Sequence, residues 1–236
     1  MPTAILRGFY IPIMQLITVG TGSSGNCYLL KRDNDHFIAL DCGCAWKKVM
    51  VATKFRPSDI DLALVTHGHS DHAKYQRDFI GNGIEVIGVD NVETKKIYKK
   101  GATSDINVIA FEVPHDTKCY GYLIRVDGHT IVYMTDFGYC KYTFKSWNVS
   151  TFLIACNYID APNIDEEKYA HVVWGHSSLA TVKDILAVNQ CDAMKNVILC
   201  HMSEDADTDR MIAEVKEVVG ESVNVALAEK GKEIEL

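Results

Sequence analysis

The sequence predicts an α/β protein in which layered β-sheets are covered by helices. Three short strands separated by Gly, Asp and Asn turns come first, and strand-like and helix-like segments alternate after them. Hairpins followed by mixed elements favour stacked sheets over a doubly wound parallel sheet. The 236 residues, 47% of them hydrophobic, suffice for one such domain over residues 14–236, with residues 1–13 as an N-terminal extension.

The individual elements follow from short apolar runs and from the residues that bound them. Strands are expected where a β-branched or apolar run lies between turn residues, at 15–19, 26–30, 36–40, 62–65, 108–113, 119–126, 130–134 and 197–200. Helices are expected at 45–54, 179–189 and 207–219. Ser177 and Ser178 are good N-cap residues for the second of these helices.

The charge balance limits the surfaces by which the chain can bind its partners. It has 24 Lys and Arg against 31 Asp and Glu, a formal net charge of −7, which excludes a uniformly basic nucleic-acid surface. A phosphodiester can still be held where metal ions supply the positive charge. The segment Lys95-Lys96-Ile-Tyr-Lys99-Lys100 places lysines partly on one helix face, a pattern that is usually a solvated face and sometimes tracks a nucleic-acid backbone.

Cysteine usage and the N-terminal segment predict a cytoplasmic protein. Most of the 8 cysteines lie inside apolar stretches, as core thiols do, and the chain is too long and too poor in cysteine for a secreted disulfide scaffold. Residues 1–13 lack the charged start and the long apolar run of a signal peptide. No run of 18 apolar residues is present, so no membrane-spanning helix is expected.

One glycine motif imitates a dinucleotide-binding site. Gly20-Thr-Gly22-Ser-Ser-Gly25 matches the spacing G-x-G-x-x-G, but that site requires a helix to begin at the third glycine. The residues that follow, 26–30, form an apolar β-type run instead. We therefore predict a tight turn between two strands that binds no dinucleotide.

A dense cluster of potential metal ligands follows the buried strand at 62–65. It reads Thr66-His67-Gly-His69-Ser-Asp71-His72, which places four ligands within six residues. Their spacing does not fit one face of a helix, where ligands recur at three or four residues. It suits a loop that turns into a helix, with side chains converging on two neighbouring points. The cluster therefore predicts a metal centre.

Two metal ions need more ligands than one loop provides. Three further candidates, His115, Asp136 and His201, each follow an apolar strand and begin a loop. Imidazole nitrogen combined with carboxylate oxygen suits divalent ions such as zinc or manganese, with iron as a further option. An isolated His or Asp in such a place is usually a cap or a surface residue, but three in series after a metal-type loop favour ligation.

The order H-x-H-x-D-H, then His, Asp and His, resembles the metallo-β-lactamase superfamily over nearly all of residues 14–236. The resemblance implies a four-layer αββα sandwich with the site at one edge of the sheets. It also implies that Asp41 is the buried aspartate that braces the ligand loops. The ligands that it implies are His67, His69 and His115 for one metal ion, Asp71, His72 and His201 for the other, and Asp136 as the bridge.

Smaller motifs are similar to those of the WalJ (YycJ)-type group, which is regarded as acting on DNA as 5′-to-3′ exonucleases. They are Gly20–Asn26, Pro114-His-Asp116, Thr135-Asp136, Asn157-Tyr158, Gly175-His-Ser-Ser178 and Cys200-His-Met-Ser203. The last two also resemble the tRNase Z arrangement. The group usually has a Glu shortly before Asn-Tyr-Asp, where this chain has Ala155 and Cys156, so the substrate and the catalytic efficiency are left open.

The implied activity is hydrolysis of a nucleic-acid or nucleotide phosphodiester by water that two metal ions activate. Asp71 and His176 are the expected catalytic residues, since Asp71 can orient the water and His176 can donate to a phosphate or leaving-group oxygen. The expected substrate contacts are Ser23, Asn26, Asn157 and Ser177. A cyclic-nucleotide phosphodiesterase, a thioester or lactone hydrolase and a non-catalytic scaffold remain as alternatives, and the oligomeric state is left open.

Overall fold

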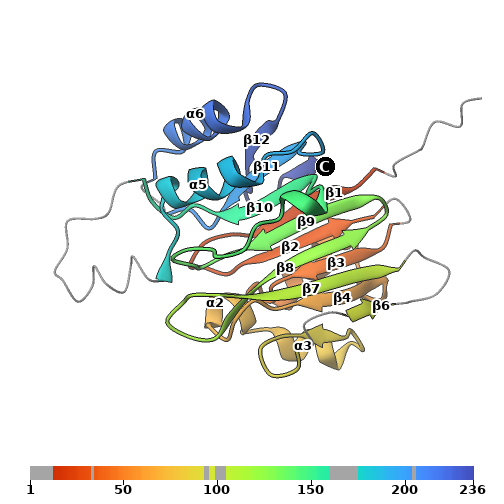
Figure 1. Cartoon of the computed structure of the whole chain (residues 1–236). Coiled ribbons are helices and arrows are strands. Elements are labelled where there is room, and N and C mark those ends of the chain that lie inside the picture. The colour runs from red at the N-terminus through yellow and green to blue at the C-terminus, as the bar shows by residue number, and fades with distance from the viewer. Residues whose placement is uncertain (1–12, 33–34, 93–95, 99–104, 160–174, 204–205) are drawn as a thin grey trace, which may run out of the picture.

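The computed structural model describes residues 13–32, 35–92, 96–98, 105–159, 175–203 and 206–236, and the expected extension at 1–13 lies almost entirely outside them. Two mixed β-sheets form its centre (Figure 1). The first has the strand order β13 (Glu233–Glu235), β1 (Gln15–Gly20), β2 (Cys27–Lys31), β3 (Phe37–Leu40), β4 (Ile60–Leu64), β5 (Val86–Ile87). The second has the order β12 (Asn224–Leu227), β11 (Asn196–Cys200), β10 (Thr151–Ala155), β9 (His129–Met134), β8 (Cys119–Val126), β7 (Ile106–Val113), β6 (Lys96–Tyr98).

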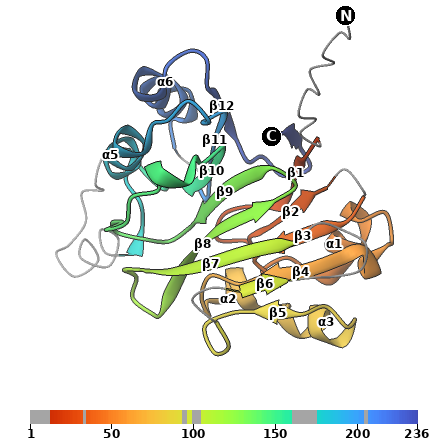
Figure 2. The ribbon, with the colours of Figure 1, turned by 45° about the vertical axis from the view of Figure 1, so that its right-hand side comes forward.

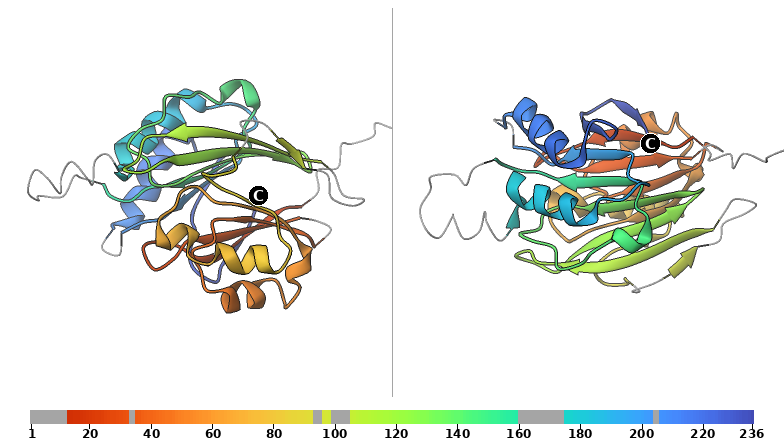
Figure 3. Two further views of the ribbon diagram at one scale, coloured as in Figure 1. Left: turned by 90° about the horizontal axis from the view of Figure 1, so that it is seen from below. Right: turned by 45° about the horizontal axis from the view of Figure 1, so that its top comes forward.

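Helices cover the outer faces of both sheets and so complete the four layers that were predicted. The described helices are α1 (Trp46–Ala52), α2 (Ser70–Ala73), α3 (Gln76–Gly81), α5 (Leu179–Asn189) and α6 (Thr208–Val219), with short 3-10 turns at Pro57–Asp59 and Lys145–Trp147. Figure 2 shows α1 and α3 beside the first sheet and α5 and α6 beside the second. The view from below in Figure 3 shows the two sheets stacked between these helices.

The first sheet is buried on both faces, which explains why its strands are continuous apolar runs. In β2, Tyr28 and Leu30 belong to the core between the sheets, whereas Cys27 and Leu29 belong to the smaller core beneath α1 and α3. Successive side chains of a strand point to opposite faces, so every residue of such a strand must be apolar or otherwise satisfied. The described residues therefore form two apolar cores, and the larger extends from the space between the sheets to α5 and α6.

The expected strands and helices are present, with ends displaced by at most two residues. One prediction is wrong: the lysine segment is not helical where it is described, because Lys96–Tyr98 pairs with β7 as an antiparallel strand. The rest of that segment lies outside the described residues. All eight cysteines have free thiols. Among the described helices, none has the length and apolar character to cross a membrane.

A buried ion-pair network joins the two sheets at one edge. Arg32, at the end of β2, donates from Nε to Asp127 Oδ2 at 2.6 Å and from a terminal nitrogen to Asp61 Oδ2 at 2.9 Å. Asp61 belongs to the first sheet, and Asp127 lies in the turn between β8 and β9 of the second. The network fixes the sheets relative to each other at the edge where β3, β4, β7, β9 and β11 begin.

Candidate metal centre

At the opposite edge, the carboxyl ends of strands from both sheets bring the predicted ligands together. Residues 66–72 follow β4 of the first sheet, and α2 begins at Ser70, as the expected loop-to-helix transition requires. His115 follows β7, Asp136 follows β9, and His201 follows β11, all in the second sheet. Candidate ligands 130 residues apart in sequence, Asp71 and His201, therefore meet where the two sheets face each other.

The donor atoms form two neighbouring groups, and within each group all of them lie within 4.8 Å of one another. The members of the groups are His67, His69 and His115 in the first and Asp71, His72, Asp136 and His201 in the second. In the first group, His115 Nε2 lies 3.3 Å from His69 Nδ1. In the second, His72 Nε2 lies 3.2 Å from Asp71 Oδ2. These separations between ligand atoms leave room for a cation among them.

Asp136 connects the two groups. Its Oδ2 lies 2.8 Å from His72 Nε2 and 3.5 Å from His201 Nε2, both in its own group. The same oxygen lies 3.7 Å from His67 Nε2 in the other group. A single carboxylate thus faces both donor sets, which is the position that a bridging ligand occupies.

Three residues at this edge have left-handed backbone conformations although none is glycine. Asp41, Asp136 and His201 have φ of 59°, 48° and 54°, and each lies within two residues of the end of a strand. Side chains other than glycine adopt this region rarely, and such conformations concentrate at functional sites. The left-handed residue turns the chain sharply at the strand end and directs its side chain across the sheet edge.

Asp41 is a fully buried carboxylate that organises the ligand loop. Its Oδ2 accepts a hydrogen bond from His72 Nδ1 at 2.6 Å and a second from the hydroxyl of Tyr133. Its Oδ1 accepts from the backbone N–H and the hydroxyl of Thr66, at 2.8 and 3.0 Å. A carboxylate on Nδ1 fixes the ring and leaves Nε2 facing the donor group, an arrangement typical of metal-binding histidines.

The glycine-rich segment is a turn between β1 and β2, as predicted, since β2 pairs antiparallel with β1 and begins two residues after Gly25. The turn packs against Gly43, which in turn packs against the backbone of Asp71 in the ligand loop. A Cβ on Gly43 would lie 1.7 Å from the backbone oxygen of Asp71, and one on Gly25 would lie 2.5 Å from the oxygen of Gly43. The glycines thus allow three backbone segments to meet behind Asp71.

The environment of the site sets the protonation of its donors. Burial lowers the pKa of His67 to about 2 and also lowers the pKa of His115, so both rings are neutral and able to ligate. Burial opposes ionisation of Asp71, but hydrogen bonds from His201 and His72 hold its pKa far below the ordinary value. His67 and His115 are therefore neutral imidazoles that lie near the charged carboxylate of Asp71, and divalent ions bind such combinations of donors.

The predicted catalytic and substrate residues differ in how closely they contact this centre and in how exposed they are. His176 Nδ1 is 3.4 Å from Asp136 Oδ1, and the His176 side chain is 33% exposed. Asn26 is buried and donates from Nδ2 toward His72 Nε2 at 3.0 Å and Asp71 Oδ2 at 3.3 Å.

The other predicted substrate residues differ in accessibility. Asn157 donates from Nδ2 to His201 O at 2.9 Å and accepts from Ser177 N at 2.8 Å. Ser177 is buried, and its hydroxyl donates to Phe137 O at 2.8 Å. Ser23 is exposed on the glycine turn. These contacts show Asn157 and Ser177 ordering the loops that carry His201 and Phe137, and their contact with substrate remains a prediction.

One carboxylate at the first donor group was not singled out from the sequence. Asp116 Oδ1 lies 3.1 Å from His115 Nε2 and 3.4 Å from His69 Nε2. The motif Pro114-His-Asp116 contained it, but an Asp beside a ligand histidine has no periodicity that marks it as a partner. Only the fold of the loop shows that its oxygen turns back to the imidazoles.

Comparisons with known proteins support the resemblance that the sequence predicted. The family model described as "Metallo-beta-lactamase superfamily" matches residues 20–74, which include the glycine turn and the ligand loop. The Exodeoxyribonuclease WalJ of Streptococcus pneumoniae is 29% identical over 51% of this chain and 53% of its own length, so the match spans about half of that relative. The Exodeoxyribonuclease YycJ of Bacillus anthracis is 25% identical over 90% of this chain and 89% of its own.

Solved structures confirm the predicted fold. The metallo-β-lactamase fold protein YhfI of Bacillus subtilis superposes with a TM-score of 0.72 at 18% identity, over 95% of this chain and all of that one. The short form of human tRNase Z superposes with a TM-score of 0.61 at 16% identity, over 94% and 98%. At these identities the likeness shows the fold alone. The family model and the two sequence relatives, together with this fold, bear out the resemblance to the metallo-β-lactamase superfamily that the sequence predicted.

Proposed function

We propose that this chain, which has the metallo-β-lactamase fold, is a metal-dependent phosphodiesterase, and specifically a nuclease of the 5′-to-3′ exonuclease type. The observation that carries the proposal is the pair of donor groups joined by Asp136. The names of the sequence relatives, both exodeoxyribonucleases, support nucleic acid as the substrate class.

The donor set fits two divalent ions, which we propose to be zinc or manganese. His67 Nε2 is buried and has no hydrogen-bond partner among the described residues, and it faces Asp136 Oδ2. A buried polar atom without a partner is unfavourable, and a cation between the two atoms would satisfy both. We assign His67, His69 and His115 to one ion, Asp71, His72 and His201 to the other, and Asp136 to both.

Two bound ions would supply an acidified water and positive charge against the phosphodiester oxygens. The chain's own residues complete the reaction. Asp71 is 22% exposed, the most accessible side chain of its group, and can accept a hydrogen bond from the attacking water. His176, anchored toward Asp136 through Nδ1, can donate a proton or hydrogen bond to the leaving oxygen from its exposed side.

The test offers the purified protein, loaded separately with zinc or manganese, a panel of 5′-phosphorylated DNA and RNA in single- and double-stranded form. Cyclic nucleotides, a thioester and a lactone serve as the alternative substrates. We expect nucleotides to be released from the 5′ end of DNA, and we expect Asp136→Asn to abolish their release. The substitution Asp184→Asn, on the exposed face of α5, is the matched control. Turnover of the thioester or lactone without turnover of any phosphodiester would refute the proposal.

A further inference from the structure

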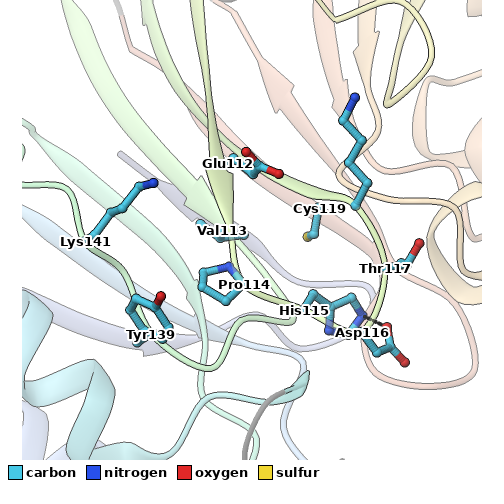
Figure 4. A pocket seen from close by; sticks show the side chains of 10 residues that line it. Glu112, Val113, Pro114, His115, Asp116, Thr117, Cys119, Tyr139 and Lys141 are labelled. Atoms are coloured by element: carbon cyan, nitrogen blue, oxygen red, sulfur yellow. Dashed lines mark ion pairs between the residues drawn. The ribbon is translucent and has the colours of Figure 1, made fainter.

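A polar pocket of about 450 Å³ adjoins the first donor group (Figure 4). His115 and Asp116 form the end of the pocket toward the metal centre. The lining residues that carry the argument are Glu112, Lys118, Tyr139 and Lys141. Figure 4 shows Tyr139 and Lys141 on one wall, with Glu112 and the 114–117 segment opposite them. The pocket lies outside the two donor groups, and no ligand role for it follows from the proposed metal sites.

Both walls of the pocket are continuous with residues that hold the centre. One wall is the segment after β7 that carries His115, and the other is the segment after Asp136. The backbone N–H of Gly138 donates to Pro114 O at 3.1 Å and ties the two segments together. A molecule in the pocket is therefore held at a fixed position relative to both His115 and Asp136.

The pocket is lined by two lysines, two acidic residues, Glu112 and Asp116, and one aromatic ring, that of Tyr139. Lys118 Nζ lies 5.4 Å from the ring centre of Tyr120, and Lys141 Nζ lies 5.3 Å from that of Tyr142. A cation held over an aromatic face loses less freedom when it binds an anion, because its position is already restricted. Tyr139 is 50% exposed, so its ring is accessible to a ligand. In a chain of net charge −7, this pocket thus brings two lysines and one exposed aromatic ring together, and these groups can bind a phosphate and a base.

We propose that this pocket binds one unpaired nucleotide adjacent to the scissile phosphodiester, with its base stacked on Tyr139 and its phosphate paired with Lys118 and Lys141. The proposal rests on the nuclease function and names its substrate class as a single-stranded end. A volume near 450 Å³ suits one small ligand and not a duplex. Glu112 repels a second phosphate and can accept a hydrogen bond from a base amino group or a sugar hydroxyl.

Stacking is tested with Tyr139→Ala and, as its conservative partner, Tyr139→Phe. Base–aromatic stacking contributes about 1–3 kcal/mol per base, so Tyr139→Ala should raise KM for a single-stranded oligonucleotide by roughly 5- to 150-fold. Tyr139→Phe should retain the wild-type KM because the ring remains. Thermal melts and metal content of both variants check that the fold and the metal centre are retained. Equal KM values for Tyr139→Ala and wild type would overturn the stacking role.

The phosphate contacts are tested by salt dependence. Each lysine that neutralises a phosphate of a single strand contributes about −0.7 to the slope of log K against log salt concentration. Lys118→Gln and Lys141→Gln should each make that slope shallower by about this amount. Lys145→Gln is the matched control, since Lys145 is also exposed but lines a different pocket. Unchanged slopes in both pocket variants would overturn the phosphate contacts.

A binding measurement separates this proposal from the nuclease function. Fluorescence anisotropy with a labelled phosphorothioate oligothymidylate reports affinity without requiring cleavage. If the wild type cleaves no phosphodiester but binds this probe more tightly than Tyr139→Ala and Lys141→Gln, the pocket assignment stands and the nuclease function fails. If all the variants bind the probe as the wild type does, the pocket assignment fails whatever the activity. Binding of the same sequence as a duplex should not depend on Tyr139.

Discussion

The substitution Asp41→Asn isolates the effect of one buried charge on the metal centre. Asparagine has nearly the same shape as aspartate and is tolerated at a φ of 59°, so the backbone turn after β3 can persist. The amide oxygen should remain on the backbone N–H of Thr66, which can only donate. The amide NH₂ then faces His72 Nδ1 and the hydroxyl of Tyr133, two groups that donate to Asp41 in the native protein.

This exchange of an acceptor for a donor determines how far metal affinity is expected to fall. The hydroxyl of Tyr133 can turn and accept, but His72 can accept at Nδ1 only in the tautomer that carries its proton on Nε2. That proton would lie where the second metal ion binds. Loss of such a supporting carboxylate typically weakens metal binding 10- to 100-fold, which corresponds to about 1.4–2.7 kcal/mol. The ion that we propose for His67, His69 and His115 should keep its affinity, because Asp41 contacts none of the atoms that face it.

The assay is a competitive titration of zinc against a chromophoric chelator, which resolves two affinities per chain. We expect one dissociation constant to rise 10- to 100-fold and the other to stay unchanged. Asp184→Asn, on the exposed face of α5, is the control and should change neither constant. Thermal melts of both variants check that they fold. If Asp41→Asn binds two zinc ions with wild-type affinities, the hydrogen bond to Nδ1 does not control the tautomer of His72, and the reasoning is refuted.

Three further predictions test the site and its scaffold. Asp71→Asn should lower turnover of the best phosphodiester by about 10²–10⁴ while the fold and the first metal ion persist; wild-type turnover at saturating metal would make Asp71 structural. Gly43→Ala should displace the loop of Asp71 and lower zinc stoichiometry toward one per chain, as elemental analysis would show, because its Cβ has no room beside Asp71 O. Arg32→Leu should lower the free energy of unfolding by about 3 kcal/mol in urea titrations, because it removes the guanidinium from the buried Asp61, which keeps only His36, and from Asp127; a loss below 1 kcal/mol would contradict this.

The features that could be predicted from the sequence are local in the chain. The ligand loop is visible because four ligands lie within six residues directly after an apolar strand. His115, Asp136 and His201 can be recognised because each follows an apolar strand, and the carboxyl ends of parallel strands meet at one edge of a sheet. The predicted strand ends agree with the structure to within two residues for a similar reason, because turn residues and apolar runs alternate sharply along this chain.

The features that could not be predicted depend on contacts between distant segments. Nothing in the sequence near Asp116 indicates that its carboxylate turns toward His69. The buried role of Ser177 arises from Phe137 O and Asn157, which lie 20 to 40 residues away. Lys96–Tyr98 carries a helix-like lysine pattern, but pairing with β7 satisfies its backbone and overrides that local preference. Tertiary hydrogen bonding decided each of these cases.

The distribution of ligands between the sheets has a mechanical consequence. The residues at 67–72 come from the first sheet, whereas His115, Asp136 and His201 come from the second, so each proposed metal ion is held by both sheets. Arg32 joins the sheets at the opposite edge. Without metal, the relative position of the two sheets at the site depends on the core and on that distant ion pair. Metal binding would therefore link the two sheets at the edge opposite Arg32. At metal concentrations above the dissociation constant, the free energy of unfolding should rise with the logarithm of the metal concentration. A small displacement of one sheet would change the distances in both donor groups at once. The two proposed sites would therefore lose their geometry together. The core that fixes the sheets relative to each other thus contributes to the metal affinity of the centre.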